Sequence, residues 1–185
     1  LCLGNLFQGR LNRLEDAEQQ YIAAQKFERR NPMLLANHAR LLARLNRHDE
    51  ASNKFRQVIE LLNDREFRDR QSEYTNVRLQ AHLWLLNFEL AREALHELAD
   101  AAGRGDANAF YLIREQVFEC NRMGIGLRLA ELMSKSSFAD FLAPFIHALI
   151  AADSGAIESI DGVSAEARAM VMEVLNELDQ DIKPN

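Results

Sequence analysis

A repeat with a period of 34 residues limits what this chain can fold into more than any other feature of its sequence. Residues 10–17 read Arg-Leu-Asn-Arg-Leu-Glu-Asp-Ala, and residues 44–51 read Arg-Leu-Asn-Arg-His-Asp-Glu-Ala. The correspondence continues at three further pairs: Tyr21 with Phe55, Ala24 with Val58, and Phe27 with Leu61. A period of this length is typical of proteins that stack copies of one supersecondary unit.

Each repeat predicts two helices joined by a short polar turn. In the second unit the apolar side of the first helix has the spacing i, i+3, i+4 and i+7: Leu35, His38, Ala39 and Leu42. Residues 46–49 form the turn, and a second apolar stripe follows: Ala51, Phe55, Val58 and Leu62. One such hairpin cannot bury both of its faces, so neighbouring hairpins must stack.

This unit resembles the tetratricopeptide repeat (TPR) family over residues 1–62. The resemblance lies in the 34-residue helix-turn-helix, with an alanine, an aromatic residue four positions later and a small apolar residue three positions beyond that. Asn31-Pro32 lies near the inter-repeat proline of the family, a few residues late. The resemblance implies an all-α, right-handed solenoid of stacked antiparallel helix pairs, with the first helix of each pair lining a concave groove.

The rest of the chain fits further, more degenerate units. We expect repeats at about 1–30, 31–63, 70–100 and 107–133, followed by helices that cap the solenoid over 134–185. The added residues between the second and third units lie in the charged stretch 63–70. Glycine and serine positions mark further helix ends and starts: a C-cap at Gly103, a turn at 123–126, and starts at Ser137 and Ser164. Because the chain begins inside an apolar stretch, we expect a fragment of a longer protein.

The groove that the resemblance implies supplies the candidate partner-binding residues. They are Met33, Asn37, Arg40 and Arg44 in the second unit, and Asn76 and Gln80 in the third. Arginine and amide side chains can hold a peptide backbone or a carboxylate. The alternative is that the two arginines only keep this face soluble. A clamp for the C-terminal carboxylate of a chaperone, known in some TPR proteins, is not expected, because Glu73 stands where those proteins attract the carboxylate.

Catalytic and metal-binding motifs are not apparent in the sequence. The five histidines form no HExxH pattern, and His96-Glu97 lacks a second ligand at the required spacing. The two cysteines, Cys2 and Cys120, are far apart, which fits free thiols in a reducing cytoplasm. Gly124-Ile125-Gly126 follows no strand and precedes no lysine of a phosphate-binding loop. We therefore expect no enzyme activity, no metal and no cofactor.

Charge and hydropathy narrow the class of partner. The chain has 22 basic and 28 acidic residues, and the acidic excess lies after residue 70, which disfavours nucleic acid as a partner. No apolar run approaches the roughly 20 residues that cross a membrane. We expect a cytoplasmic, non-catalytic module that binds a protein or peptide. The alternative is a sensor or oligomerisation arm of a larger bacterial signalling ATPase or effector, in which the chain associates with itself.

Overall fold

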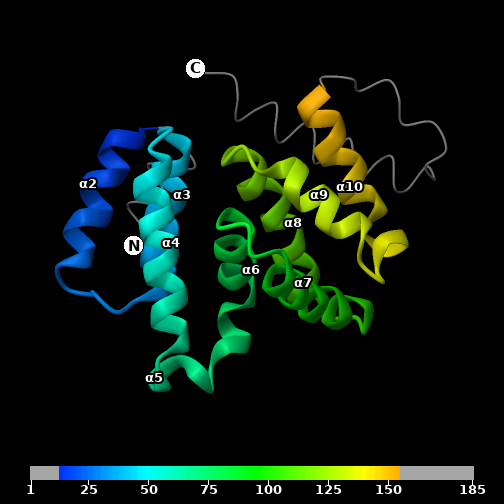
Figure 1. The fold of residues 1–185 in the computed structure, drawn as a ribbon, viewed down its shortest axis with the longest axis horizontal. Helices are drawn as coiled ribbons and strands as arrows, with labels where there is room; N and C mark the ends of the chain where they lie inside the picture. Colours follow the sequence, from blue (N-terminus) through cyan, green and yellow to red (C-terminus); the bar gives the residue numbers. More distant parts are fainter. Residues whose placement is uncertain (1–12, 155–185) are drawn as a thin grey trace. The chain divides into compact units, whose positions relative to one another are not determined.

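The computed structural model describes residues 13–154, and this part of the chain is all-helical, with no strand (Figure 1). The all-α class predicted from the sequence is thereby confirmed. The helices are α2 (Leu14–Gln25), α3 (Pro32–Arg44), α4 (His48–Asn63), α5 (Arg65–Arg68), the 3₁₀ helix η1 (Gln71–Tyr74), α6 (Thr75–Trp84), α7 (Phe88–Gly103), α8 (Ala107–Arg122), α9 (Gly126–Ser134) and α10 (Ala139–Ser154).

The described residues divide into two compact units, with the boundary between Asn87 and Phe88. Helices α2 to α6 belong to the first unit, and α7 to α10 belong to the second. The division lies between α6 and α7, which is inside the repeat expected over residues 70–100.

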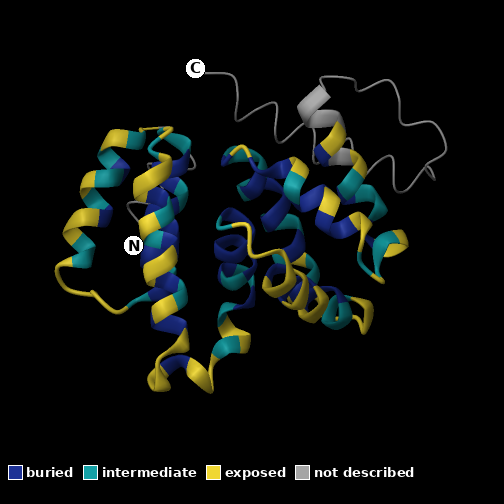
Figure 2. Cartoon of the chain, viewed as in Figure 1, coloured by how far each residue is buried: buried dark blue, intermediate teal, exposed yellow. Residues whose placement is uncertain are grey.

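Helix α3 is at the centre of the first unit. It packs against α2, α4 and α6, and ten of its 13 residues are buried (Figure 2). A helix that is apolar on most sides is stable in water only when other helices cover it. Asn31 begins α3 by accepting a hydrogen bond from the Leu34 amide at 3.1 Å, and Pro32 occupies the first helical position.

The 34-residue correspondence holds at the core positions of α2 and α4. Ala17 and Ala51 are fully buried, as are the aromatic side chains four residues later, Tyr21 and Phe55. The two residues of the last pair, Phe27 and Leu61, do not have equivalent burial. Helix α2 ends at Gln25, before the position equivalent to the end of α4, so Phe27 is 89% exposed although Leu61 is 8% exposed.

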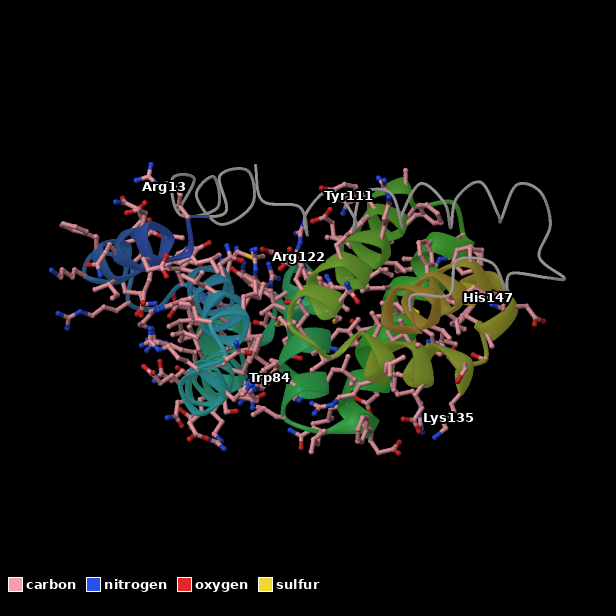
Figure 3. All side chains as sticks on the ribbon, turned by 90° about the horizontal axis from the view of Figure 1, so that it is seen from above. Arg13, Trp84, Tyr111, Arg122, Lys135 and His147 are labelled. Carbon is pink, nitrogen blue, oxygen red and sulfur yellow. The ribbon has the colours of Figure 1, made fainter. Side chains whose placement is uncertain are left out.

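The charged stretch after α4 forms two short helical turns. Helix α5 and the 3₁₀ helix η1 connect α4 to α6, and Phe67 of α5 is buried against Tyr74 with ring centroids 6.0 Å apart. Helix α6 then packs on both α3 and α4. Trp84, the last residue of α6, is labelled in Figure 3. Its Nε1 donates to the Ser52 hydroxyl at 2.9 Å.

Four helices end in the same left-handed turn. The residue after the helix cap has φ of +59° at Asn46, +63° at Leu86, +90° at Gly105 and +73° at Gly124. Each of these residues donates its amide back into the last turn of the helix, as does the residue that follows it. This is the hydrogen-bond pattern of the Schellman motif, which satisfies the last carbonyl groups of a helix. Glycine and asparagine adopt this conformation readily, whereas leucine does so at a cost.

Opposite stability changes are therefore expected from two substitutions in these turns. Leu86→Gly should raise the free energy of unfolding by about 0.5–1 kcal/mol. The left-handed conformation costs a non-glycine residue ~1–2 kcal/mol, and the greater flexibility of glycine in the unfolded chain offsets part of this gain. Gly124→Ala should lower it by about 1 kcal/mol through the backbone alone, since nothing lies within 4 Å of the added Cβ. Urea denaturation of both variants measures the signs, and equal signs would contradict this explanation.

The second unit is built around α8. This helix packs against α7, α9 and α10, and Asp106 begins it by accepting hydrogen bonds from the amides of Asn108 and Ala109. Phe110 contacts Phe141 and Phe145 of α10, with ring centroids 6.3 and 5.6 Å apart.

Two sequence expectations about helix ends need correction, and a third lies outside the described residues. Helix α7 includes Gly103, and the left-handed residue of the turn is Gly105, because the helix continues as far as its cap at Arg104. Helix α10 begins at Ala139, two residues after the expected Ser137. The helix expected from Ser164 lies outside the described residues.

Candidate functional site

Helices α3 and α6 carry all six residues that the sequence predicts for partner binding. Met33, Asn37, Arg40 and Arg44 belong to α3 and have a spacing of three or four residues, which places them along one side of the helix. Asn76 and Gln80 are four residues apart in α6 and share a side of that helix in the same way. Because α3 and α6 are in contact, these two stripes can meet. We call the six residues the α3–α6 face.

Arg40 joins the two helices at the centre of this face. Its Nε donates to Oε1 of Gln80 at 2.6 Å, and its Nη1 donates to Oδ1 of Asn37 at 2.8 Å. The two acceptors are neutral amides, which orient the guanidinium without contributing an opposite charge. Arg40 itself remains partly exposed, so the guanidinium lies at the boundary between the interior and the surface.

Asn37 and Gln80 are buried more deeply than the side chains that line an open groove. Asn37 is 5% exposed and Gln80 is fully buried. The Nε2 atom of Gln80 is buried and has no hydrogen-bond partner. An unpaired buried donor costs about 1–3 kcal/mol, so it requires an explanation.

The remaining predicted residues surround this cluster at intermediate exposure. Met33, Arg44 and Asn76 are each partly exposed. Arg44 follows Arg40 by about one turn of α3, which adds a second positive charge to the same side of the helix. Arg40 therefore contacts both Asn37 and Gln80, and Met33, Arg44 and Asn76 lie on the same sides of α3 and α6.

A second polar cluster, between α2, α3 and α4, was missed by the sequence analysis. Arg47, just before α4, donates from Nη1 to both carboxylate oxygens of Glu18 at 2.7 Å. It also makes two 2.7 Å bonds to Glu50, one from Nε and one from Nη2. These hydrogen bonds raise the pKa of the Arg47 guanidinium above its usual range, with Glu50 the larger cause. The bridge fastens α2 to the turn between α3 and α4.

His38 lies inside this second cluster. The residue is 4% exposed, its ring is stacked on Tyr21, and its Nδ1 accepts from Nε2 of Gln25 at 2.7 Å. Oε1 of Gln25 in turn accepts from Nζ of Lys54 at 2.9 Å. Burial is the main reason that the pKa of His38 falls to about 4, and the positive charge of Lys54 lowers it further. His38 is therefore neutral at pH 7, with its proton on Nε2.

The signal for this cluster is present in the sequence, but it is not periodic. Glu18 and Arg47 are 29 positions apart, and Gln25 and His38 are 13 apart. Neither separation matches the 34-residue repeat. The pairs can be predicted only when it is known which sides of the helices face one another.

Chemically, the α3–α6 face offers hydrogen-bond donors and positive charge. It contains no cysteine, serine, histidine or carboxylate that could act as a nucleophile or base. Within residues 13–154, no group of three or more histidine, cysteine or acidic side chains could hold a metal ion. The described helices also include none with the length and apolar character to cross a membrane. Cys120 is fully buried in α8.

Comparisons of the chain with known proteins identified no relative. No protein-family model matches the chain, and no curated protein or solved structure matches it significantly. The resemblance to the TPR family thus depends on the residues of the chain itself.

Proposed function

We propose that this chain is a non-catalytic helical-repeat module that binds a protein or peptide partner on the α3–α6 face. The single observation that supports this most is the bridge from Arg40 to Asn37 and Gln80, which joins side chains of two successive first helices of the expected repeats. In a TPR-like solenoid the first helices of neighbouring units line the binding surface. The same arrangement fits a cytoplasmic adaptor built from stacked helix pairs.

Rigidity is a second argument for binding at this place. Helices α3 and α6 have most of their residues buried, so the α3–α6 face is presented by a well-packed scaffold and not by a loop. A preorganised surface loses less conformational entropy when a partner binds, which leaves more of the contact energy as affinity.

Charge reversal on the α3–α6 face tests the proposal. The double variant Arg40→Glu/Arg44→Glu is expected to lose the partner that the wild-type chain captures from a lysate of its source cells, because the face changes from positive to negative. Bound proteins are identified by mass spectrometry, and binding of each candidate is then measured with purified components. The affinity should fall by a factor of about ten or more.

The chain contains a matched control for this variant. Arg56 of α4 donates to Asn53 at 2.8 Å, the same intrahelical pair that Arg40 makes with Asn37, but both residues are exposed. Arg56→Glu should leave the partner bound. Equal loss in both variants would show a general charge effect and would contradict a site on α3 and α6. Capture of further copies of the chain alone, insensitive to the double variant, would favour an oligomerisation arm.

A further inference from the structure

The turn between α2 and α3 presents a large apolar side chain to solvent. Residues 26–30 are all exposed (Figure 2), and Phe27 is 89% exposed, more than any other large apolar residue that the structure describes. Single exposed apolar residues are normal on protein surfaces, but a phenylalanine this exposed adds nothing to the packing of its own unit. We call residues 26–30 the Phe27 turn.

The backbone holds the Phe27 turn in place from both sides. The Phe27 amide donates to the Ala24 carbonyl at 3.0 Å, which continues the last turn of α2. On the other side, Arg30 donates to Asp64 at 2.9 Å and to Glu66 at 3.2 Å. An ordered turn loses little conformational entropy when another surface covers it, so Phe27 is presented in a form suited to docking.

Two positive side chains accompany Phe27. Within residues 13–154, neither Lys26 nor Arg29 forms an ion pair. The carboxylate of the turn, Glu28, accepts a hydrogen bond from Asn31 at 2.7 Å. The Phe27 turn therefore suits a protein surface on which an apolar residue lies beside carboxylates.

The outward side of α7 has this composition. Leu90 is 45% exposed, and Glu93 follows it by three residues, so the two share a side of the helix. Glu89 is exposed one turn before Glu93 and accepts a hydrogen bond from Arg92 at 2.9 Å. In the described part of the chain, Glu93 has no ion-pair partner. We call Glu89, Leu90 and Glu93 the α7 patch.

The two units also differ in net charge. The described residues of the first unit include 13 basic and 11 acidic side chains, whereas those of the second unit include 6 basic and 10 acidic ones. Two copies of the chain therefore attract each other when the first unit of one approaches the second unit of the other.

We infer that the Phe27 turn of one copy docks on the α7 patch of a second copy. Phe27 covers Leu90, while Lys26 and Arg29 face the two carboxylates of the patch. Because the two surfaces differ, the contact is heterologous and links copies into rings or open chains. This assembly goes beyond the binding proposed for the α3–α6 face and uses none of its residues.

A second copy fits the Phe27 turn better than a membrane or a nucleic acid does. Asp64 and Glu66, which are joined to the turn through Arg30, are exposed. A uniformly negative surface of lipid headgroups or phosphates would repel these carboxylates. A protein surface with a few carboxylates at defined places can face the cations of the turn and avoid them.

Charge reversal on each surface, followed by mixing, tests the inference. Lys26→Glu/Arg29→Glu makes both surfaces of a copy negative, and Glu89→Lys/Glu93→Lys makes both positive. Each variant alone should associate about tenfold or more weakly than the wild-type chain, because like charges then meet. An equimolar mixture should regain association, since every contact again joins opposite charges. Sedimentation velocity over a series of concentrations measures association, and circular dichroism verifies the fold of each variant.

Phe27→Ala tests the apolar part of the contact. Association should weaken by about tenfold, while the fold is kept because the side chain is exposed in the single copy. Arg56→Glu, which reverses an exposed charge on α4, is the control and should associate like the wild-type chain. Arg40→Glu/Arg44→Glu should also keep this association, so failure of the assembly is distinguishable from failure of the proposed binding function.

Association of the wild-type chain that rises with concentration, is lost in each charge variant and returns on mixing is the expected result. A chain that stays monomeric at every concentration would overturn the inference. Charge variants that associate normally, or that fail to associate when mixed, would overturn it as well. Vesicles of phosphatidylserine are the competing surface. Co-sedimentation of a monomeric wild-type chain with them, lost in Phe27→Ala, would overturn the choice of a second copy in favour of an anionic membrane.

Discussion

Lowering the pH from 6.5 to 4 is expected to remove about 3 kcal/mol of folding stability through His38 alone. Burial holds the pKa of this histidine at about 4 in the folded protein, whereas the unfolded chain has the ordinary value of 6.5. Between these values the unfolded state binds the additional proton. The contribution is therefore fully present above pH 6.5 and is lost as the pH falls toward 4. Urea denaturation over this pH range measures it.

His38→Asn isolates the contribution of this residue. The asparagine carries an Oδ1 that can accept from Nε2 of Gln25, as Nδ1 of the histidine does, but it has no proton to bind. His82 remains in both proteins, and its pKa is also lowered, by burial and then by Arg78, so it cancels in the comparison. The variant should show a flatter decline of stability with acid. The same decline in both proteins would refute the role given to His38.

The second large effect is expected from Phe55→Ala, which should lower the free energy of unfolding by about 3–5 kcal/mol. Phe55 is fully buried in α4 and lies 5.8 Å from the Trp84 ring of α6, so its removal opens a cavity between two helices. The measurement is the urea midpoint at constant m-value, since the compactness of the unfolded chain should not change.

Phe27→Ala is the control for this substitution. It removes the same atoms from a side chain that is 89% exposed, so the change should be within about 0.5 kcal/mol. Comparable losses at Phe55 and Phe27 would mean that residues 13–63 are packed differently from the structure described above.

Sequence reasoning succeeded where the determining interactions are local. The stripe of α4 at 51, 55, 58 and 62 is buried, as its spacing predicts, because a helix presents residues three and four apart on one side. The turn expected at 46–49 is present around Asn46, although α4 begins already at His48. The break at Gly124 follows from the ease with which glycine adopts a positive φ.

Features that depend on which helices meet could not be obtained in this way. Leu86 takes the left-handed position of the turn that ends α6, although its side chain disfavours that conformation. The pairs Glu18–Arg47 and Gln25–His38 arise from the packing of α2 on α3 and α4. Neither the repeat nor the helical period indicates these pairs.

The candidate site shows both what helical register predicts and what it leaves open. Helical register and the family resemblance indicate Asn37, Arg40 and Gln80, and in the structure Arg40 contacts the other two. Their depth was not predicted, because register gives the direction of a side chain and not the number of neighbours that cover it. That depth makes Gln80 a residue that orients the Arg40 side chain, with Nε2 of its own amide buried.

Hydrogen–deuterium exchange of the chain with and without its captured partner tests the central claim most directly. We expect new protection in residues 32–44 and 75–84, the segments of α3 and α6, with little change in α2 and in residues 107–154. The same exchange pattern should be absent when Arg40→Glu/Arg44→Glu replaces the wild-type chain. Protection confined to α2, or to α8 to α10, would contradict a binding site on the α3–α6 face.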